Sequence, residues 1–262
     1  MRVRIRKIAR RLLPDSIRKP LGTAAGKFDE AVVQRIQGLI FDLCGGKFKM
    51  DGCTFMIPKD QTSLAYRSTF LSDLYEVDDL EVVRRCIKPA DHVLELGGCM
   101  GIVSCITNKL LVDKSRHIVV EANPFCIPTL HRNRDLNQCK FLIKNCAVSL
   151  QREVTFHTNP SVIVGSSLQR TNGLPVRVPA SSLAELDARY GPFTALIIDI
   201  EGAELETLES ARGLLRNYRV VIVELHDWAI GVEGMNRCRE ILAEAGLKLH
   251  HRRESVEGWQ RP

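Results

Sequence analysis

The sequence contains no apolar run that approaches 18 residues, and its N-terminus lacks the apolar core of a signal peptide. We therefore predict neither a membrane-spanning helix nor secretion. It also contains no C-x-x-C pair, although it has nine cysteines. An odd number of cysteines without that spacing indicates buried or free thiols in a reducing compartment, rather than a disulfide framework or a zinc site. We expect a cytoplasmic protein.

Most of the chain also lacks net charge. The formal charge of the 262 residues is +6, but residues 1–20 hold eight Lys or Arg and one Asp, which leaves −1 for the remainder. A nearly neutral body does not predict a basic surface for nucleic acid. The length and the 45% apolar content suffice for one large α/β domain. We place this domain at residues 64–262, after a basic arm, a helix and an accessory hairpin in residues 1–63.

Residues 1–13 alternate arginines with apolar side chains. Such a segment can form a basic amphipathic helix on an anionic membrane, where each positive charge contributes about 1 kcal/mol. The alternative, which we prefer, is a solvated arm that packs on its own domain. Further along, apolar spacing predicts a helix over residues 28–44, a hairpin over residues 47–58 around Asp51-Gly52, and a helix that contains Leu80 and Ile87.

Residues 93–101, V-L-E-L-G-G-C-M-G, predict a buried strand that runs into a ligand loop and a helix over residues 102–111. In a doubly wound sheet, the carboxyl end of the first strand is where a cofactor binds. The loop lacks the glycine spacing of a dinucleotide fingerprint, whereas the carboxylate of Glu95 suits the ammonium of S-adenosylmethionine. Tight packing between strand and helix explains the glycines equally well. The loop residues concerned are Gly97, Gly98 and Gly101.

A second buried strand is predicted at residues 117–122, and it ends in Glu121. A nucleotide-binding fold places a carboxylate there to accept hydrogen bonds from both ribose hydroxyls. Asn123-Pro124 then opens a helix that runs to about Leu136. Residues 141–148 predict a third strand, which would bring Asn145 and Ala147 near an adenine base.

Residues 154–157 and 176–178 predict added strands, and the Gly165-Ser166-Ser167 loop between them is a candidate substrate lid.

Acidic residues also follow the later strands. The fourth core strand, residues 193–200, runs into Asp199, Glu201 and Glu204. A fifth strand, residues 219–224, precedes His226. A helix over residues 232–246 and final strands from Lys248 complete the chain.

The acids and the imidazole at these strand ends are candidates for acid–base chemistry or for binding a metal. An alcohol loses its proton at neutral pH only with the help of a general base or a metal. His226 is our first candidate for the base and Asp199 the second. A divalent cation held by Asp199, Glu201 and a neighbouring acid is an alternative, although no spacing in the sequence requires it.

The segment D-I-E-G-A-E at 199–204 is similar to the D-V-E-G-A-E signature of the FkbM family of S-adenosylmethionine-dependent methyltransferases. The resemblance covers roughly residues 64–260, and it includes V-L-E-L-G-G-x-x-G at 93–101, V-E-A-N-P at 120–124, the Tyr75-Glu76 pair and two Ser-Ser-Leu segments at 166–168 and 181–183. It implies an α/β, Rossmann-like class I methyltransferase fold with a mostly parallel seven-stranded sheet and helices on both faces. It also implies O-methylation of a sugar, a glycan or a secondary metabolite.

The strand-end residues and the resemblance together assign expected roles to named residues. The expected cofactor-binding residues are Tyr75, Glu76, Glu95, Gly97, Gly98, Gly101, Glu121, Asn123, Asn145 and Ala147, and the expected catalytic residues are Asp199, Glu201 and His226. The chain departs from the family pattern at Ile197, where a Lys is usual, and at Ala184, where an Asp is usual. These departures permit an alternative, a non-catalytic protein that binds glycans or acts as a scaffold on the same fold. A nicotinamide-dependent oxidoreductase is disfavoured by the missing third fingerprint glycine.

Overall fold

The structure is a computed structural model that describes residues 24–71, 76–159, 162–167 and 173–262. The described chain divides into two compact units. The first contains the described residues up to Gly46 and from Ser63 to Leu71, and the second contains residues 47–62 and the chain from Glu76 onward. The boundary that the sequence predicts between residues 63 and 64 stays a prediction. Residues 1–13 and Tyr75, which carry two further predictions, lie outside the described residues.

The first unit is helical. It consists of α2 (Ala24–Leu43), which confirms the predicted helix, α3 (Leu64–Ser68) and the 3-10 helix η2 (Thr69–Leu71). The rings of Phe41 and Phe70 stack with their centroids 5.6 Å apart. Nearby, the buried Arg67 pairs with Asp42, with 2.9 Å between Nε and Oδ1. These contacts hold the two helices together, because each joins α2 to the segment around α3.

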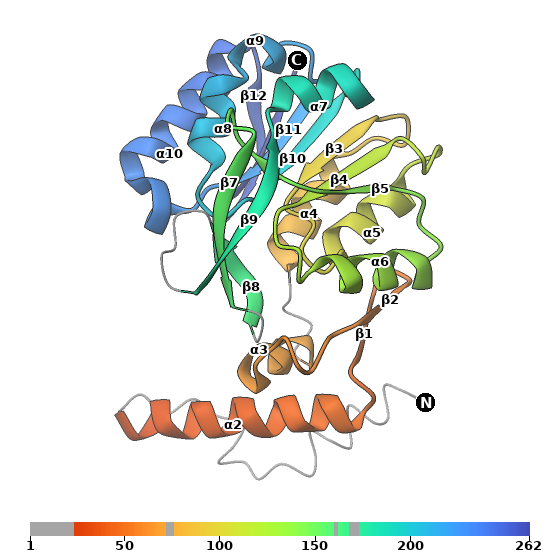
Figure 1. The fold of residues 1–262 in the computed structure, drawn as a ribbon, viewed down its shortest axis with the longest axis vertical. Coiled ribbons are helices and arrows are strands. Elements are labelled where there is room, and N and C mark those ends of the chain that lie inside the picture. The colour runs from red at the N-terminus through yellow and green to blue at the C-terminus, as the bar shows by residue number, and fades with distance from the viewer. Residues whose placement is uncertain (1–23, 72–75, 160–161, 168–172) are drawn as a thin grey trace. The chain divides into compact units, whose positions relative to one another are not determined.

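The second unit is built on a seven-stranded sheet with the strand order β12-β13-β11-β10-β3-β4-β5 (Figure 1). Five adjacent strands, β11, β10, β3, β4 and β5, are parallel, and β13 runs antiparallel to both of its neighbours. The sheet confirms the predicted mostly parallel fold. Its strands are β3 (Val93–Leu96), β4 (His117–Glu121), β5 (Leu142–Asn145), β10 (Ala195–Ile198), β11 (Val220–Glu224), β12 (Lys248–Arg253) and β13 (Val256–Gln260).

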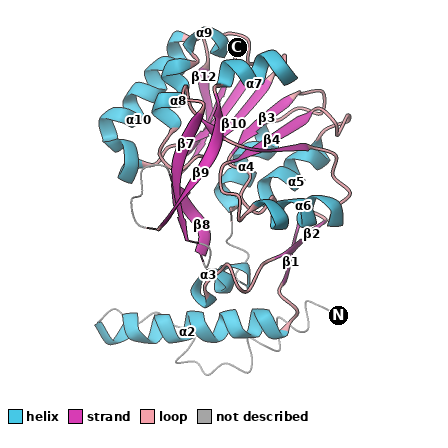
Figure 2. Ribbon diagram, in the orientation of Figure 1, coloured by secondary structure: helices cyan, strands magenta, loops and turns pink. Residues whose placement is uncertain are grey.

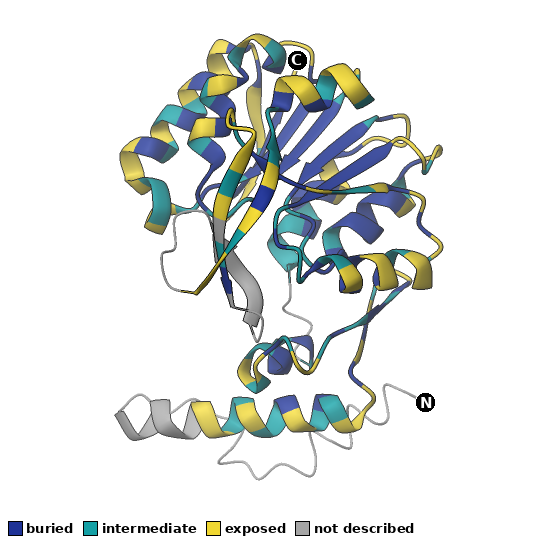
Figure 3. Cartoon of the chain, in the orientation of Figure 1, coloured by how far each residue is buried: buried dark blue, intermediate teal, exposed yellow. Residues whose placement is uncertain are grey.

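Helices cover both faces of this sheet, because its central strands are apolar on both sides. Leu94 and Leu96 of β3 face one core, while Val93 faces the other. Figure 3 shows the consequence, with buried strands between helices whose outer surfaces are exposed. The helices are α4 (Val77–Cys86), α5 (Ile102–Leu110) and α6 (Ile127–Leu136) on one side, and α7 (Leu183–Tyr190), α8 (Glu204–Ser210), α9 (Arg212–Leu215) and α10 (Asp227–Glu244) on the other.

The predicted hairpin is confirmed as β1 (Lys47–Met50) and β2 (Cys53–Met56), which pair antiparallel. Two asparagines one helical turn apart attach it to α6. The Oδ1 atoms of Asn133 and Asn137 accept hydrogen bonds at 2.8 Å from the backbone N–H groups of Met56 and Thr54. Side-chain amides therefore complete the open edge of β2, and the hairpin belongs to the second unit.

A four-stranded sheet, order β6-β9-β7-β8, corrects two predictions (Figure 2). Residues 141–148 do not form one strand, because the chain leaves the main sheet after Asn145 and residues 147–148 pair with β9 instead. The segment predicted as a Gly165-Ser166-Ser167 loop lies in a strand. The strands are β6 (Ala147–Val148), β7 (Glu153–Asn159), β8 (Val162–Ser167) and β9 (Leu174–Ser181).

Two helix boundaries also differ from the predictions. α6 begins at Ile127, after a turn that contains Asn123 and Pro124. α10 begins at Asp227, earlier than residue 232, and has a kink at Gly231, where φ is 63°.

All nine cysteines are free. Among the described residues, none of the helices has the length and apolar character that crossing a membrane requires.

Candidate active site

The predicted glycine loop and the predicted acidic segment meet at the centre of the sheet. The chain places β4 and β5 on one side of β3 and β10 and β11 on the other, so the strand order reverses between β3 and β10. Gly97 follows β3 with φ of 98°, and a Cβ at this position would lie 1.6 Å from the backbone oxygen of Asp199, which follows β10. Ligands of open α/β sheets bind in the crevice outside such a switch point.

Internal packing accounts for the glycines of this loop. A Cβ on Gly98 would lie 2.5 Å from Cγ1 of Val119, and one on Gly101 would lie 2.7 Å from Cδ1 of Leu130. Larger residues would therefore push the loop away from β4 and α6. The glycines make a tight turn possible but do not indicate which ligand binds. The polar groups around them carry that information.

Glu121 at the end of β4 is a carboxylate held in place beside the loop. Its Oε1 accepts a hydrogen bond from the N–H of Asn123 at 2.6 Å, and its Oε2 accepts one from the N–H of Cys99 at 2.7 Å. Burial raises the pKa of Glu121, although the two N–H donors oppose that shift. Asn123 is also buried, and its Oδ1 accepts from the N–H of Phe125 in the turn before α6.

Glu95 does not lie at the edge of the sheet formed by the carboxyl ends of its parallel strands, where Glu121 lies and which we call the rim. Its side chain lies in the core between β3, β4 and α5, where one oxygen accepts a hydrogen bond from the Ser104 hydroxyl and the other accepts one from Nε2 of His117 at 3.0 Å. The residue is 1% exposed. The predicted contact with a cofactor ammonium finds no support in this arrangement, because both oxygens are engaged inside the protein.

Asn145 and Ala147 lie on either side of the point where the chain leaves the main sheet. The Nδ2 of Asn145 donates to the backbone oxygens of Glu121 and Ala122, at 2.8 and 3.1 Å. It thereby fixes the segment after β4. Ala147 is buried in β6. Contact of either residue with an adenine base stays a prediction.

His226 stands at the centre of the acidic segment, at the N-terminus of α10. Its Nδ1 donates to Oε1 of the fully buried Glu204 at 2.9 Å. Its Nε2 faces three further carboxylates, with Oε2 of Glu201 at 3.7 Å, Oδ1 of Asp199 at 3.8 Å and Oε2 of Glu224 at 3.9 Å. The predicted catalytic residues Asp199, Glu201 and His226 are thus brought together.

The density of carboxylates changes the protonation of this cluster. Burial, together with the charge of Glu224 and of other nearby acids, raises the pKa of Asp199 well above its usual range. Burial likewise raises the pKa of Asp79, in the first turn of α4, to about 9. For His226, burial lowers the pKa, but the hydrogen bond to Glu204 and the surrounding carboxylates reverse this effect and leave the pKa raised. The rim therefore suits a cationic ligand.

Comparison with known proteins identifies the family. The family model described as the methyltransferase FkbM domain matches residues 95–249, which is more than half of the chain. The chain belongs to the FkbM methyltransferase family. It is therefore a methyltransferase of the S-adenosylmethionine-dependent class. No curated protein matches it significantly.

The FkbM methyltransferase is also similar to solved structures of low sequence identity. A ribosomal protein L11 methylase from Lactobacillus delbrueckii subsp. bulgaricus is 14% identical, with 70% of this chain and 76% of that chain covered and a TM-score of 0.45. A precorrin-6y C5,15-methyltransferase from Geobacter metallireducens is 11% identical, with 72% and 88% covered and a TM-score of 0.46. At these values the likenesses say nothing about the acceptor of this chain.

Three site residues of the FkbM methyltransferase have left-handed backbone conformations that are costly for residues other than glycine. They are Glu76, Cys99 and Glu201, with φ of 52°, 41° and 51°. Each such residue costs of order 1–3 kcal/mol, and they concentrate at functional sites. Glu76 is the N-cap residue of α4 and lies near enough to raise the pKa of Asp199.

Sequence reasoning missed Asp79 and Glu224 as members of this rim. Asp79 has the pattern of an ordinary acid in the first turn of a helix, which complements the helix dipole. Glu224 could have been found, because it ends a parallel strand beside β10 in the same manner as Glu121 ends β4. The same edge of the sheet therefore collects acids from β4, β10, β11 and α4.

Proposed function

We propose that this FkbM methyltransferase transfers a methyl group from S-adenosylmethionine to a hydroxyl of a sugar, a glycan or a secondary metabolite. The observation that carries the proposal is the cluster of His226 with Asp199, Glu201 and Glu224 beside the glycine loop. Activating a hydroxyl requires groups that take up its proton or stabilise its anion. Carboxylates and an imidazole at one strand edge are groups of this kind.

The residues on the β4 side fit the cofactor. Each oxygen of Glu121 accepts one backbone N–H and retains a lone pair, so the carboxylate can also accept hydrogen bonds from ribose hydroxyls. Glu76 adds a carboxylate at the same edge, and the crowding of acids that helps to raise the pKa of Asp79 to about 9 favours a ligand that carries an ammonium and a sulfonium. When bound, the cofactor supplies a methyl group on an electron-poor sulfur.

We place the acceptor hydroxyl at the cluster of acids and His226 at the ends of β10 and β11. Its oxygen forms a bond to the methyl carbon while the bond from that carbon to sulfur breaks, and the electron pair of the broken bond stays on sulfur. The hydroxyl proton passes to a group of the cluster. Holding the two reactants in line supplies much of the acceleration, because it removes the entropy cost of their encounter.

Two measurements test this function. Isothermal titration with S-adenosylmethionine and with NAD should give binding of the first only. Mass spectrometry of glycans and small metabolites from a deletion strain should then show a product that lacks one methyl group and regains it on complementation. Binding of NAD in place of S-adenosylmethionine would refute the proposal, and binding of S-adenosylmethionine without any change in the methylated products would favour a non-catalytic protein.

A further inference from the structure

We propose that Asp199, Glu224 and His226 form a binding site for a divalent transition-metal ion, for which Mn²⁺ is the probe. The inference rests on the proposed function, which it deepens by assigning His226 as a metal ligand rather than as the general base. Each of the three residues offers one ligand atom, and these atoms lie within 4.8 Å of one another. An imidazole nitrogen together with carboxylate oxygens is a donor set for Mn²⁺, Fe²⁺ or Zn²⁺.

The distances around Nε2 of His226 fit an ion better than direct contacts. Carboxylate oxygens of Asp199 and Glu224 lie 3.8 and 3.9 Å away, too far for a hydrogen bond. Two ligand atoms that are each about 2.1 Å from one ion can stand up to about 4.2 Å apart. The separations therefore leave the room that a bound ion needs. Glu201, with Oε2 at 3.7 Å from Nε2, is near enough to complete the set.

The ligand atoms are oriented by a second set of hydrogen bonds. Nδ1 of His226 donates to the buried Glu204, and since a carboxylate only accepts, the lone pair of the neutral ring lies on Nε2. Oε1 of Glu224 accepts from the hydroxyl of Ser255 at 2.9 Å, which turns Oε2 toward His226. A metal-binding histidine that donates its other N–H to a carboxylate is the usual arrangement in metal sites.

Asp199 provides an independent indication of a ligand. Its Oδ1, the atom that faces Nε2 of His226, is inaccessible to solvent and has no hydrogen-bond partner in the part of the chain that is described. A buried carboxylate oxygen left without a partner is destabilising. Its backbone is fixed, because its N–H donates to the oxygen of Leu96 at 2.9 Å. A cation at this point would satisfy the oxygen and would lower the pKa of an acceptor hydroxyl.

The test measures metal binding by the full chain without cofactor or acceptor. Chelator-treated protein is titrated with Mn²⁺, and free Mn²⁺ is followed by electron paramagnetic resonance. We expect one ion per chain, and Glu224→Gln and His226→Ala should each weaken binding strongly. Glu204→Gln should weaken it about 10- to 100-fold, which is the usual effect of losing an outer-shell partner.

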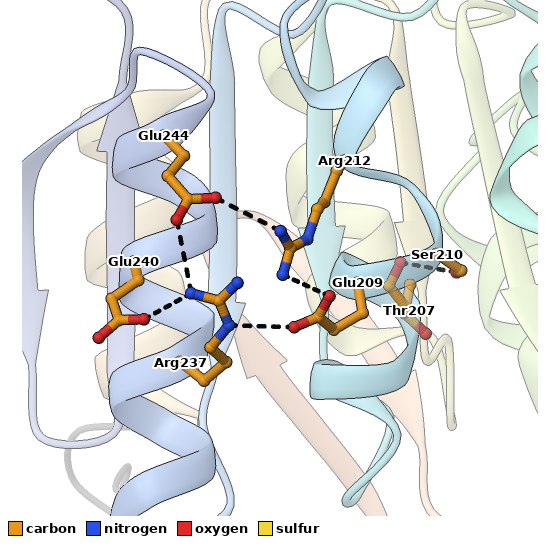
Figure 4. A network of polar contacts seen from close by, with 7 residues as sticks. All are labelled: Thr207, Glu209, Ser210, Arg212, Arg237, Glu240 and Glu244. Atoms are coloured by element: carbon orange, nitrogen blue, oxygen red, sulfur yellow. Dashed lines mark hydrogen bonds and ion pairs between the residues drawn. The ribbon is translucent and has the colours of Figure 1, made fainter.

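A matched control is Glu240→Gln, which removes one carboxylate from the Arg237 network between α8 and α10 (Figure 4). This variant should bind Mn²⁺ with wild-type affinity. No binding by wild type, or equal binding by wild type and Glu224→Gln with both proteins folded by circular dichroism, would overturn the site. Failure of the proposed function is separate: Mn²⁺ binding with this variant pattern but no methyl transfer would retain the site, whereas methyl transfer in EDTA with no Mn²⁺ binding would retain the function.

Discussion

Two glutamates at neighbouring strands have opposite roles because their surroundings differ. Both were expected at the cofactor. Glu95 lies within β3, on the face that α5 covers, and its oxygens are used by Ser104 and His117. Glu121 is the last residue of β4, so its oxygens reach the backbone of the glycine loop and of the following turn. A difference of one position relative to the strand end thus separates a structural carboxylate from a candidate ligand.

Glu121→Ala should weaken S-adenosylmethionine binding by tenfold or more. The variant removes a charged acceptor, and a hydrogen bond to a charged group is worth about 1.5–3 kcal/mol. Isothermal titration measures the change. Glu153→Ala, at an exposed position of β7, is the control and should bind as wild type. Cofactor affinity that is unchanged in Glu121→Ala would mean that the ribose is bound elsewhere.

At the scale of elements, the accessory hairpin depends on α6. Asn133 is fully buried, and its side chain accepts from the N–H of Met56 and donates to the backbone oxygen of Met100. One amide therefore ties β2 to the segment between β3 and α5. Neither strand of the hairpin is long enough to be stable alone, so this attachment has to come from the rest of the second unit.

Asn133→Ala should lower the free energy of unfolding by at least about 2 kcal/mol, because each buried polar group left without a partner costs about 1–3 kcal/mol. Urea denaturation followed by circular dichroism gives the value. Asn217→Ala, at an exposed position before β11, should stay within about 0.5 kcal/mol of wild type. Equal midpoints for the two variants would show that the hairpin does not depend on this amide.

Asp91 lies just before β3 and bonds to residues just before β10 and β11. Its charge should appear in the pH dependence of stability. The buried carboxylate accepts hydrogen bonds from Arg219 and from the hydroxyl of Thr194. Burial alone would raise the pKa of Asp91, but the bonds from Arg219 and the backbone hold it below its usual range. A lowered folded-state pKa stabilises the protein above the unfolded-state pKa of about 3.9, and this stabilisation is lost as the pH falls toward the folded-state value.

The free energy of unfolding of wild type should therefore fall more steeply below about pH 4 than that of Asp91→Asn. Above pH 5 the variant should be the less stable protein, because Arg219 loses its charged partner. Urea denaturation at a series of pH values measures both. Parallel curves for the two proteins over the acidic range would rule out Asp91 as a source of acid sensitivity.

Helices and strands that depend on neighbouring residues were predicted well from the sequence. The runs of apolar and β-branched residues predicted β3, β4, β10 and β11, and the Asp51-Gly52 turn predicted the hairpin. The segment 141–148 failed because Val148 pairs with Ser181, a partner far along the chain that no local periodicity reveals. The candidate site was predicted only in part for the same reason. Residues next to strand ends were recognised, whereas Asp79 belongs to a helix whose packing on the sheet is a long-range property.

At the scale of the whole molecule, opposite charges are separated along the chain. Residues 1–20 are strongly basic, while the second unit concentrates carboxylates at one edge of its sheet. Apart from Tyr75, which lies outside the described residues, all residues that we propose for the cofactor and the acceptor lie at or after Glu76, in the second unit. The predicted roles of the two ends of the chain can therefore be tested separately.

Removal of residues 1–13 should leave S-adenosylmethionine affinity and methyl transfer to a soluble acceptor unchanged, because none of the residues in the proposed site is removed. Titration and a transfer assay on the truncated chain check this, and a loss of cofactor binding would contradict the predicted domain organisation. Co-sedimentation with anionic liposomes tests the remaining alternative. We expect equal sedimentation of both chains. Sedimentation of the full chain alone, abolished by about 1 M salt because its Debye length is about 3 Å, would instead establish the arm as a membrane contact.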